Sequence, residues 1–221
     1  MKISQPFDMH THQIDSFGIY NLMFEDLDSI TDFSSKNISI GLHPWKIEVE
    51  NWVKQLEKVE QFAQNQNVVA IGECGLDRMI EIPMEVQKMV FEAQVKLAEK
   101  TQKPVIIHCV RAFDELLAWK KKSKVTVQLV VHGFNNNIET AQQLIKHGFY
   151  LSFGAALLNP NSNAVKIITQ IPIEKIFLET DTKPIAIESV YEVAAKRLNI
   201  ETEKLYGQII DNLNTIGIWT N

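Results

Sequence analysis

Short runs of apolar, mostly β-branched residues recur along the 221-residue chain, and most are followed by a stretch of helical periodicity. Such runs are typical of strands buried on both faces of a parallel sheet. Seven of them predict strands, at Phe7–His12, Ile38–His43, Val68–Glu73, Val105–His108, Val127–His132, Tyr150–Phe153 and Ile176–Glu179. Apolar residues at helical spacing predict helices over Asn51–Gln66, Glu85–Lys100, Ile138–His147, Glu188–Leu198 and Glu203–Leu213.

The alternation of strands and helices predicts an α/β protein with a parallel sheet. Polar side chains stand at or just beyond the ends of the predicted strands, at His12, His43, Glu73, His108, His132 and Asp181. An open sheet would spread these residues along a crevice, whereas a barrel gathers the carboxyl ends of its strands around one point. We therefore predict a TIM-type (β/α) barrel.

The first part of this barrel departs from the regular pattern. The only candidate for an eighth strand is Gly18–Phe24, which follows His12 by a few residues. A parallel return normally needs about a dozen residues, so we expect the first β/α unit to be shortened or irregular. No linker or break in composition divides the sequence, which predicts a single domain over residues 1–221.

Composition narrows the class of protein. Apolar residues make up 45% and charged residues 22% of the chain, and the net charge is −5. This balance argues against a protein that coats nucleic acid through bulk charge, although it leaves room for a local basic groove. The sequence shows no apolar signal-peptide core and no run long enough to span a membrane. The two cysteines, Cys74 and Cys109, have no zinc-knuckle or disulfide spacing, and we expect a cytoplasmic protein.

The segment F-D-M-H-T-H, Phe7–His12, carries the strongest chemical signal. In a strand, alternate side chains share one face, so Asp8, His10 and His12 would lie together. Two imidazoles and a carboxylate on one face are hard to explain by packing alone, and they indicate a metal site. For Asp8 two roles stay open: a carboxylate that supports a ligand, or a structural cap at the barrel floor.

Other predicted strands supply further ligands. An ionised Glu73 at the tip of an apolar strand needs a cation or a partner. His108 or His132 alone would more often be a hydrogen-bonded core histidine, but beside the first pair both become ligand candidates. Asp181 can bind a metal and also accept a proton from water.

Four imidazoles and two carboxylates exceed the needs of one tetrahedral zinc ion. They suit two divalent ions, Zn²⁺ or Mn²⁺ and less naturally Mg²⁺, with Glu73 as a bridge. The implied reaction is hydrolysis, with Glu73 and Asp181 as the catalytic carboxylates. For His43, in G-L-H-P-W, three roles stay open: a contact with the substrate, support of a metal ligand, or a structural role.

These residues occur in an ordered set of motifs: D-M-H-T-H, G-L-H-P-W, I-G-E-C-G-L-D, P-V-I-I-H-C, H-G-F, S-F-G and L-E-T-D. The set resembles the TatD family of metal-dependent deoxyribonucleases, within the amidohydrolase-like TIM barrels. The resemblance implies hydrolysis of phosphodiester bonds in DNA, as single strands or ends, and it gives no indication of a protein partner. It also implies a metal site made of His10, His12, Glu73, His108, His132 and Asp181.

The chain departs from the family pattern near the substrate entrance. Arg111 follows His108 by three positions instead of two, and the R-N-E-P-like segment after the last aspartate is missing. Arg111 and Lys183 are the best remaining candidates for phosphate contacts. Two alternatives stay open: a hydrolase of small amides, lactones or phosphate esters on the same two-metal site, and a metal-binding but inactive relative.

Overall fold

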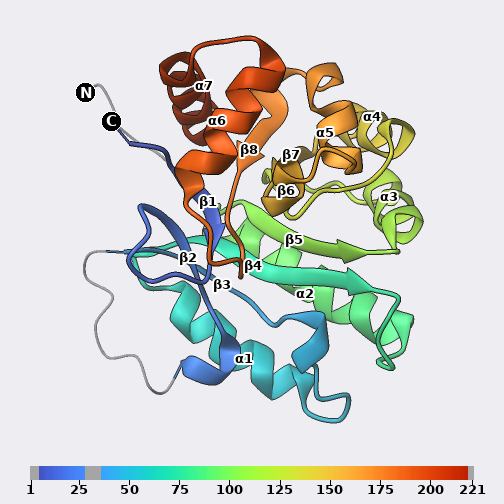
Figure 1. Cartoon of the computed structure of the whole chain (residues 1–221). Coiled ribbons are helices and arrows are strands. Elements are labelled where there is room, and N and C mark those ends of the chain that lie inside the picture. Colours follow the sequence, from blue (N-terminus) through green and yellow to red (C-terminus); the bar gives the residue numbers. More distant parts are fainter. Residues whose placement is uncertain (1–4, 28–35, 219–221) are drawn as a thin grey trace. The chain divides into compact units, whose positions relative to one another are not determined.

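The computed structural model describes residues 5–27 and 36–218. The strands within these ranges follow one another in chain order in one sheet (Figure 1). The seven predicted strands are confirmed, and the eighth candidate forms β2. The strands are β1 (Asp8–Thr11), β2 (Gly18–Leu22), β3 (Asn37–Ile40), β4 (Val68–Asp77), β5 (Val105–Val110), β6 (Leu129–Val131), β7 (Tyr150–Phe153) and β8 (Ile176–Leu178).

The five predicted helices are also confirmed, as α1 (Trp52–Ala63), α2 (Met84–Thr101), α4 (Ile138–Lys146), α6 (Ile187–Leu198) and α7 (Thr202–Thr215). Two more are α3 (Phe113–Lys122) and α5 (Asn163–Ile167). Side-chain caps fix the starts of two helices: Asn137 accepts the Thr140 amide before α4, and Ser162 accepts the Val165 amide before α5. Short 3₁₀ turns lie at Phe24–Asp26, Pro44–Lys46, Ala155–Leu158, Ile168–Gln170 and Ile173–Lys175.

The connection from β1 to β2 contains no helix, since the described residues 12–17 form only a short loop. The first residues of the two strands nevertheless lie side by side. The Asp8 amide donates to the Phe17 carbonyl at 2.9 Å, and Gly18 packs directly against Asp8. The two strands therefore run parallel over a connection shorter than a helical crossover, which confirms the predicted irregular first unit. Residues 28–35 of the following connection lie outside the described residues.

Contacts within the chain divide it into two compact units. One, here named the terminal unit, comprises Met1–Ile19 and Val131–Asn221. The other, the central unit, comprises Tyr20–Val130. The divisions pass through β2 and β6, so each of these strands has residues in both units. The single domain over residues 1–221 stays a prediction.

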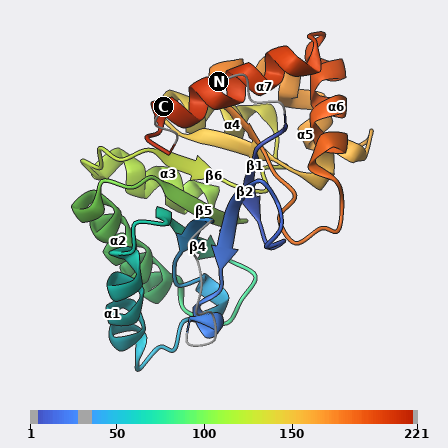
Figure 2. The ribbon, with the colours of Figure 1, turned by 90° about the vertical axis from the view of Figure 1, so that its left-hand side faces the viewer.

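In the central unit, β3, β4 and β5 pair in parallel. Helix α2 packs along β4, and α1 packs beside α2 (Figure 2). The face of α2 that is buried carries Val90, Phe91 and Ala98, at the helical spacing seen in the sequence. This packing holds β4 in place against α2.

Strand β4 is longer than predicted. Its pairing with β5 continues as far as Asp77 opposite Val110, so Glu73 lies inside the strand and the predicted end at Glu73 is wrong. His108 likewise lies inside β5. The apolar run stops before these residues, but the parallel hydrogen-bond ladder does not require apolar side chains and continues through them.

In the terminal unit, β7 pairs with β8 in parallel, and a bridge joins Thr11 of β1 to Asp181 just beyond β8. Helix α6 packs on β8 and α7 lies beside α6 (Figure 1). The Tyr191 hydroxyl of α6 donates to the Phe7 carbonyl at 2.8 Å. The start of β1 is thereby tied to α6, and its end to the segment after β8.

Of the helices in the described ranges, none has both the length and the apolar character needed to cross a bilayer.

We predict that Gly18→Ala destabilises the protein by about 1–3 kcal/mol, because an added Cβ would lie 2.1 Å from the Asp8 carbonyl oxygen. Gly207→Ala in α7 is the matched control, since nothing lies within 4 Å of its Cβ position, and alanine favours a helix by about 1 kcal/mol. Urea unfolding of both variants measures the difference. Equal stability of the two variants would contradict the close approach of β2 to β1.

Candidate metal centre

His10 and His12 direct their imidazoles at one carboxylate in the terminal unit. His10 is fully buried in β1, whereas His12 directly follows the strand and is partly exposed. Their rings lie 5.4 Å apart, edge to face. The Nε2 atoms of His10 and His12 lie 3.8 and 3.7 Å from Oδ1 of Asp181.

The backbone of Asp181 is bonded to β1, which explains how its side chain reaches these imidazoles. The Asp181 amide donates to the His10 carbonyl at 2.9 Å, and the His12 amide donates to the Asp181 carbonyl at 3.1 Å. Asp181 has a φ of 55°, a conformation that aspartate tolerates better than most residues. Its side chain is 32% exposed. The carboxylate is therefore held in place and still reaches solvent.

Asp8 holds the segment that leads into Asp181. Its Oδ1 accepts the Thr180 amide at 3.0 Å and its Oδ2 accepts the Thr180 hydroxyl at 2.6 Å. The Thr180 and Thr11 hydroxyls lie 2.9 Å apart. Burial raises the pKa of Asp8 to about 6, although the bonds from Thr180 oppose this rise. Of the two roles left open by the sequence, these contacts favour a carboxylate that supports a ligand, because Thr180 directly precedes Asp181.

Glu179 orients His132, which directly follows β6. The Oε1 atom of Glu179 lies 3.4 Å from Nδ1 of His132 and accepts the Gly133 amide at 2.6 Å. Burial alone would raise the pKa of Glu179, but the hydrogen bond and the charge of His132 hold it below its ordinary value. A carboxylate at Nδ1 fixes the ring so that Nε2 can offer its lone pair, an arrangement common at metal sites.

The terminal unit thus gathers one group of ligand atoms. His10, His132 and Asp181 each offer an atom, and these atoms lie within 4.8 Å of one another. The rings of His10 and His132 are 4.4 Å apart. Two imidazole nitrogens and one carboxylate oxygen form a donor set that fits Zn²⁺ or Mn²⁺.

In the central unit, Glu73 is brought to a buried position between two imidazoles. Gly72 and Gly75 flank it with φ values of 142° and 152°, which side-chain-bearing residues rarely adopt. A Cβ on Gly75 would lie 1.9 Å from the His108 carbonyl oxygen. The two glycines therefore let β4 approach β5 closely around Glu73.

His43 has a defined protonation pattern. Its Nδ1 accepts the Trp45 amide at 3.1 Å, so the proton of the neutral ring is on Nε2. That nitrogen lies 3.1 Å from Oε1 of Glu73 and donates to it. With both nitrogens engaged, His43 orients Glu73 in this arrangement.

His108 lies between two carboxylates. Its Nδ1 is 2.9 Å from Oε1 of Glu73, and its Nε2 is 3.1 Å from Oδ2 of Asp77. Burial would raise the pKa of Asp77, but hydrogen bonds from Trp45, Met79 and His108 hold it below the ordinary value. A neutral imidazole carries one N–H only, so the other nitrogen of His108 presents a lone pair towards the second carboxylate, and a cation would suit that position.

Asp77 is a further residue of this region that the sequence analysis did not include among the candidate site residues. Its Oδ1 atom accepts the Met79 amide at 2.8 Å and so holds the turn that follows β4. Its Oδ2 faces His108, because the alternation of the strand continues from Glu73 to Asp77. The even spacing from Glu73 was the signal that could have revealed this residue.

The central unit thus gathers a second group, in which His43, Glu73 and His108 offer atoms within 4.8 Å of one another. All three residues are buried. Because both nitrogens of His43 are engaged, Glu73 and His108 supply the ligand atoms of this group, and a nitrogen with an oxygen fits a divalent transition-metal ion better than Mg²⁺, which prefers oxygen ligands.

The two predicted phosphate contacts lie at exposed positions. Arg111 follows β5 with a φ of 50°, and Lys183 follows Asp181 by two residues. Within the described parts of the chain, neither the Arg111 guanidinium nor the Lys183 ammonium takes part in a hydrogen bond or an ion pair. The Lys183 carbonyl accepts a hydrogen bond from Gln13 at 2.9 Å, which fixes the backbone there.

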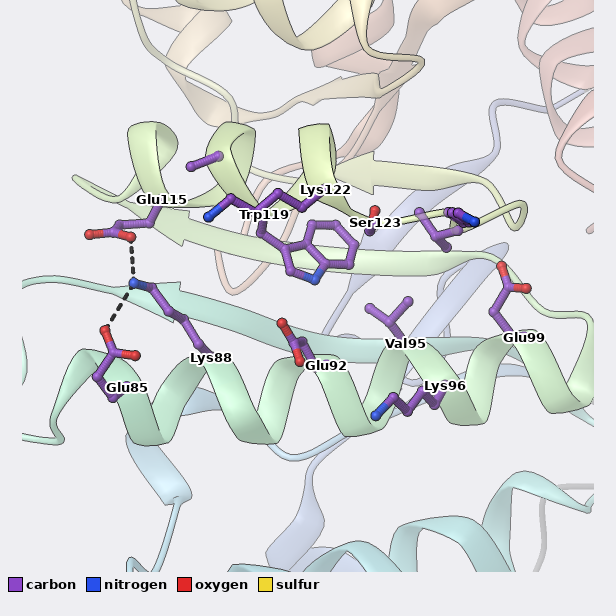
Figure 3. Close-up of a pocket in the computed structure, with 13 residues that line it drawn as sticks. Glu85, Lys88, Glu92, Val95, Lys96, Glu99, Glu115, Trp119, Lys122 and Ser123 are labelled. Atoms are coloured by element: carbon purple, nitrogen blue, oxygen red, sulfur yellow. Dashed lines mark hydrogen bonds and ion pairs between the residues drawn. The ribbon is translucent and has the colours of Figure 1, made fainter.

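A cavity of about 580 Å³ lies elsewhere in the central unit, between α2 and α3 (Figure 3). The Trp119 side chain borders it, and Lys88 pairs with Glu85 and Glu115 at one end. No candidate metal ligand lines this cavity. It is therefore separate from the ligand group of the central unit.

Comparison with known proteins points to one family. Residues 19–216 match the model described as TatD related DNase. A deoxyribonuclease Tat-D of Schizosaccharomyces pombe is 29% identical over 203 residues, which are 82% of this chain and 65% of that protein. A 3′-5′ ssDNA/RNA exonuclease TatD of Citrobacter koseri is 31% identical over 172 residues, which are 72% and 62% of the two chains. The chain thus spans less than two thirds of these relatives.

Solved structures show the fold. The crystal structure of the TatD homologue YjjV of Escherichia coli matches 96% of this chain and 97% of its own, with a TM-score of 0.81 and 22% identity. A TatD family hydrolase of Entamoeba histolytica gives a TM-score of 0.74 at 15% identity, over 96% of this chain and 97% of that one. With the chain-order sheet, these likenesses confirm the predicted TIM-type (β/α) barrel class.

We predict that Glu179→Gln weakens metal binding about 10- to 100-fold, because the neutral amide no longer fixes the His132 ring through a charged acceptor. Zinc titration by calorimetry measures the change. Glu174→Gln, which removes an exposed carboxylate from the same unit, serves as the control and should bind like the parent protein. Unchanged zinc affinity in Glu179→Gln would contradict the orienting role.

Proposed function

The chain belongs to the TatD family of DNase-related proteins, and from that membership we propose that it hydrolyses phosphodiester bonds of DNA with two divalent metal ions. The observation that carries the proposal is the presence of two groups of nitrogen and oxygen ligands on, or just beyond, the strands of this fold. One group lies in each unit, and each contains imidazoles together with a carboxylate.

We propose that the metal ions are held by six residues, four of them in the terminal unit and two in the central unit. The proposal is supported by the family match and by the ligand chemistry, since four imidazoles and two carboxylates exceed one tetrahedral site. Divalent ions bound by these residues would lower the pKa of a water molecule towards neutrality and polarise the phosphoryl group. The six residues are His10, His12, Glu73, His108, His132 and Asp181.

Asp181 is the residue we assign to proton transfer. A general base must reach both the water and the solvent to which the proton returns. The side chain of Asp181 is 32% exposed, whereas that of Glu73 is 7% exposed and already accepts from His43. Asp181 is therefore better placed to accept a proton, and Glu73 to remain ionised and hold charge.

DNA is the proposed substrate because two relatives carry names that describe nucleases. Because the net charge of the protein is −5, the phosphates must be attracted by local cationic side chains and not by the overall charge. Arg111 and Lys183 are exposed cations without partners in the described parts of the chain, and we propose that they contact the strand. The cytoplasmic location stays a prediction.

A second candidate is a hydrolase of small phosphate esters, amides or lactones on the same ligands. It is favoured by the short segment from Asp181 to α6, in which Lys183 is the one basic residue. A long polyanion would need several cations along its length, and this segment offers only Lys183. A small substrate would need one or two cations at most.

We predict that the protein shortens single-stranded DNA labelled at either end when Mn²⁺, Mg²⁺ or Zn²⁺ is added. Asp181→Asn should lower kcat by about 10²–10⁴-fold, because it removes the proton acceptor while keeping the side-chain shape. His10→Ala should abolish cleavage together with tight metal binding. The label that is lost first gives the polarity.

Asp211→Asn on α7 is the matched control, since it removes one exposed carboxylate elsewhere and should leave kcat unchanged. Undiminished cleavage by Asp181→Asn would disprove its assigned role. Stoichiometric metal with no cleavage of any DNA would reject the nuclease proposal, and turnover of small esters would then establish the second candidate.

A further inference from the structure

Trp45 is the most exposed of the large apolar residues in the described chain, at 61%. It lies in the 3₁₀ turn Pro44–Lys46, two residues after His43. A single exposed apolar side chain is common and needs no explanation. What sets Trp45 apart is that it is exposed and also fixed by bonds to the candidate metal centre.

Two hydrogen bonds hold Trp45. Its indole Nε1 donates to Oδ2 of Asp77 at 2.7 Å, and its amide donates to Nδ1 of His43 at 3.1 Å. Its ring meets the His43 ring edge to face at 4.9 Å and the His108 ring at 5.8 Å. The indole therefore has a set orientation, although most of its surface is open to solvent.

Met79 is tied to the same carboxylate. Its amide donates to Oδ1 of Asp77 at 2.8 Å, and its side chain is 60% exposed. Asp77 thus fixes Trp45 through one oxygen and the backbone of Met79 through the other. The Trp45 ring is thereby held next to the imidazole of His108, which faces that same carboxylate, and the exposed Met79 follows Asp77 by two residues.

We propose that Trp45 is a nucleobase-binding residue, on which an unpaired base of the substrate stacks, with Met79 as an apolar neighbour. The inference rests on the proposed nuclease function and names its substrate class. A fixed indole loses little conformational entropy when a flat ring covers it, and every base offers a face for stacking. Paired bases in a duplex already have their faces covered, so the subsite selects single strands.

A small ester or amide would use this residue differently. Such a substrate has no base to cover the indole, so its affinity would not depend on an aromatic side chain at position 45. A structural role for Trp45, through Asp77 and His108, would instead lower turnover of every substrate equally. The contrast between base-bearing and base-free strands separates these roles.

The test compares Kd and KM for an oligothymidylate with those for an abasic strand of equal length, whose phosphodiesters are the same. Trp45→Leu should weaken binding of the oligothymidylate about tenfold and leave the abasic strand within about twofold. Trp45→Phe, which keeps a ring but loses the Nε1 donor, should fall between wild type and Trp45→Leu. Met89→Ala, an exposed apolar residue on α2, is the control and should match wild type.

Kd is measured by fluorescence anisotropy of labelled strands, so this part of the test does not depend on turnover. If wild type binds both strands equally, or if Trp45→Leu weakens both to the same extent, the inference is wrong. If wild type prefers the base-bearing strand through Trp45 but cuts neither, the subsite stands and the proposed nuclease function fails.

Discussion

Each carboxylate buried in or beside the two ligand groups must face a hydrogen-bond donor or a cation, because a buried unpaired charge costs several kcal/mol. The protein meets this need in two ways. Asp8 is satisfied by the amide and hydroxyl of Thr180, and one oxygen of Glu179 accepts a backbone amide. Glu73 instead faces the imidazoles of His43 and His108.

This difference divides the carboxylates by what they can do. A carboxylate that accepts hydrogen bonds from backbone amides keeps its position as long as the protein is folded. Asp8 and Glu179 therefore support the residues beside them. Imidazoles can exchange a proton for a metal ion, so the surroundings of Glu73 are able to change when a cation binds. Asp181 is partly exposed, and water remains available to it.

Asp77 connects the buried chemistry to the surface. One of its oxygens contacts His108 and the Trp45 indole, and the other accepts the Met79 amide. A change at any of these groups therefore alters the hydrogen bonding of the others. The exposed indole is positioned by the same carboxylate that orients an imidazole of the ligand group, which gives a physical link between the proposed base-binding residue and the candidate metal centre.

The sequence by itself determined the positions of seven strands and five helices and the fold class, and it singled out the residue types of the candidate ligand groups, because side-chain periodicity shows which residues share a face. It left the role of Asp8 open and did not include Asp77 among the candidate site residues. Asp8 meets Thr180 across 172 positions of the chain, and β4 continues past Glu73 because its ladder with β5 continues. Only the tertiary structure decided these points, since the partner of a buried polar group comes from another element and is set by packing.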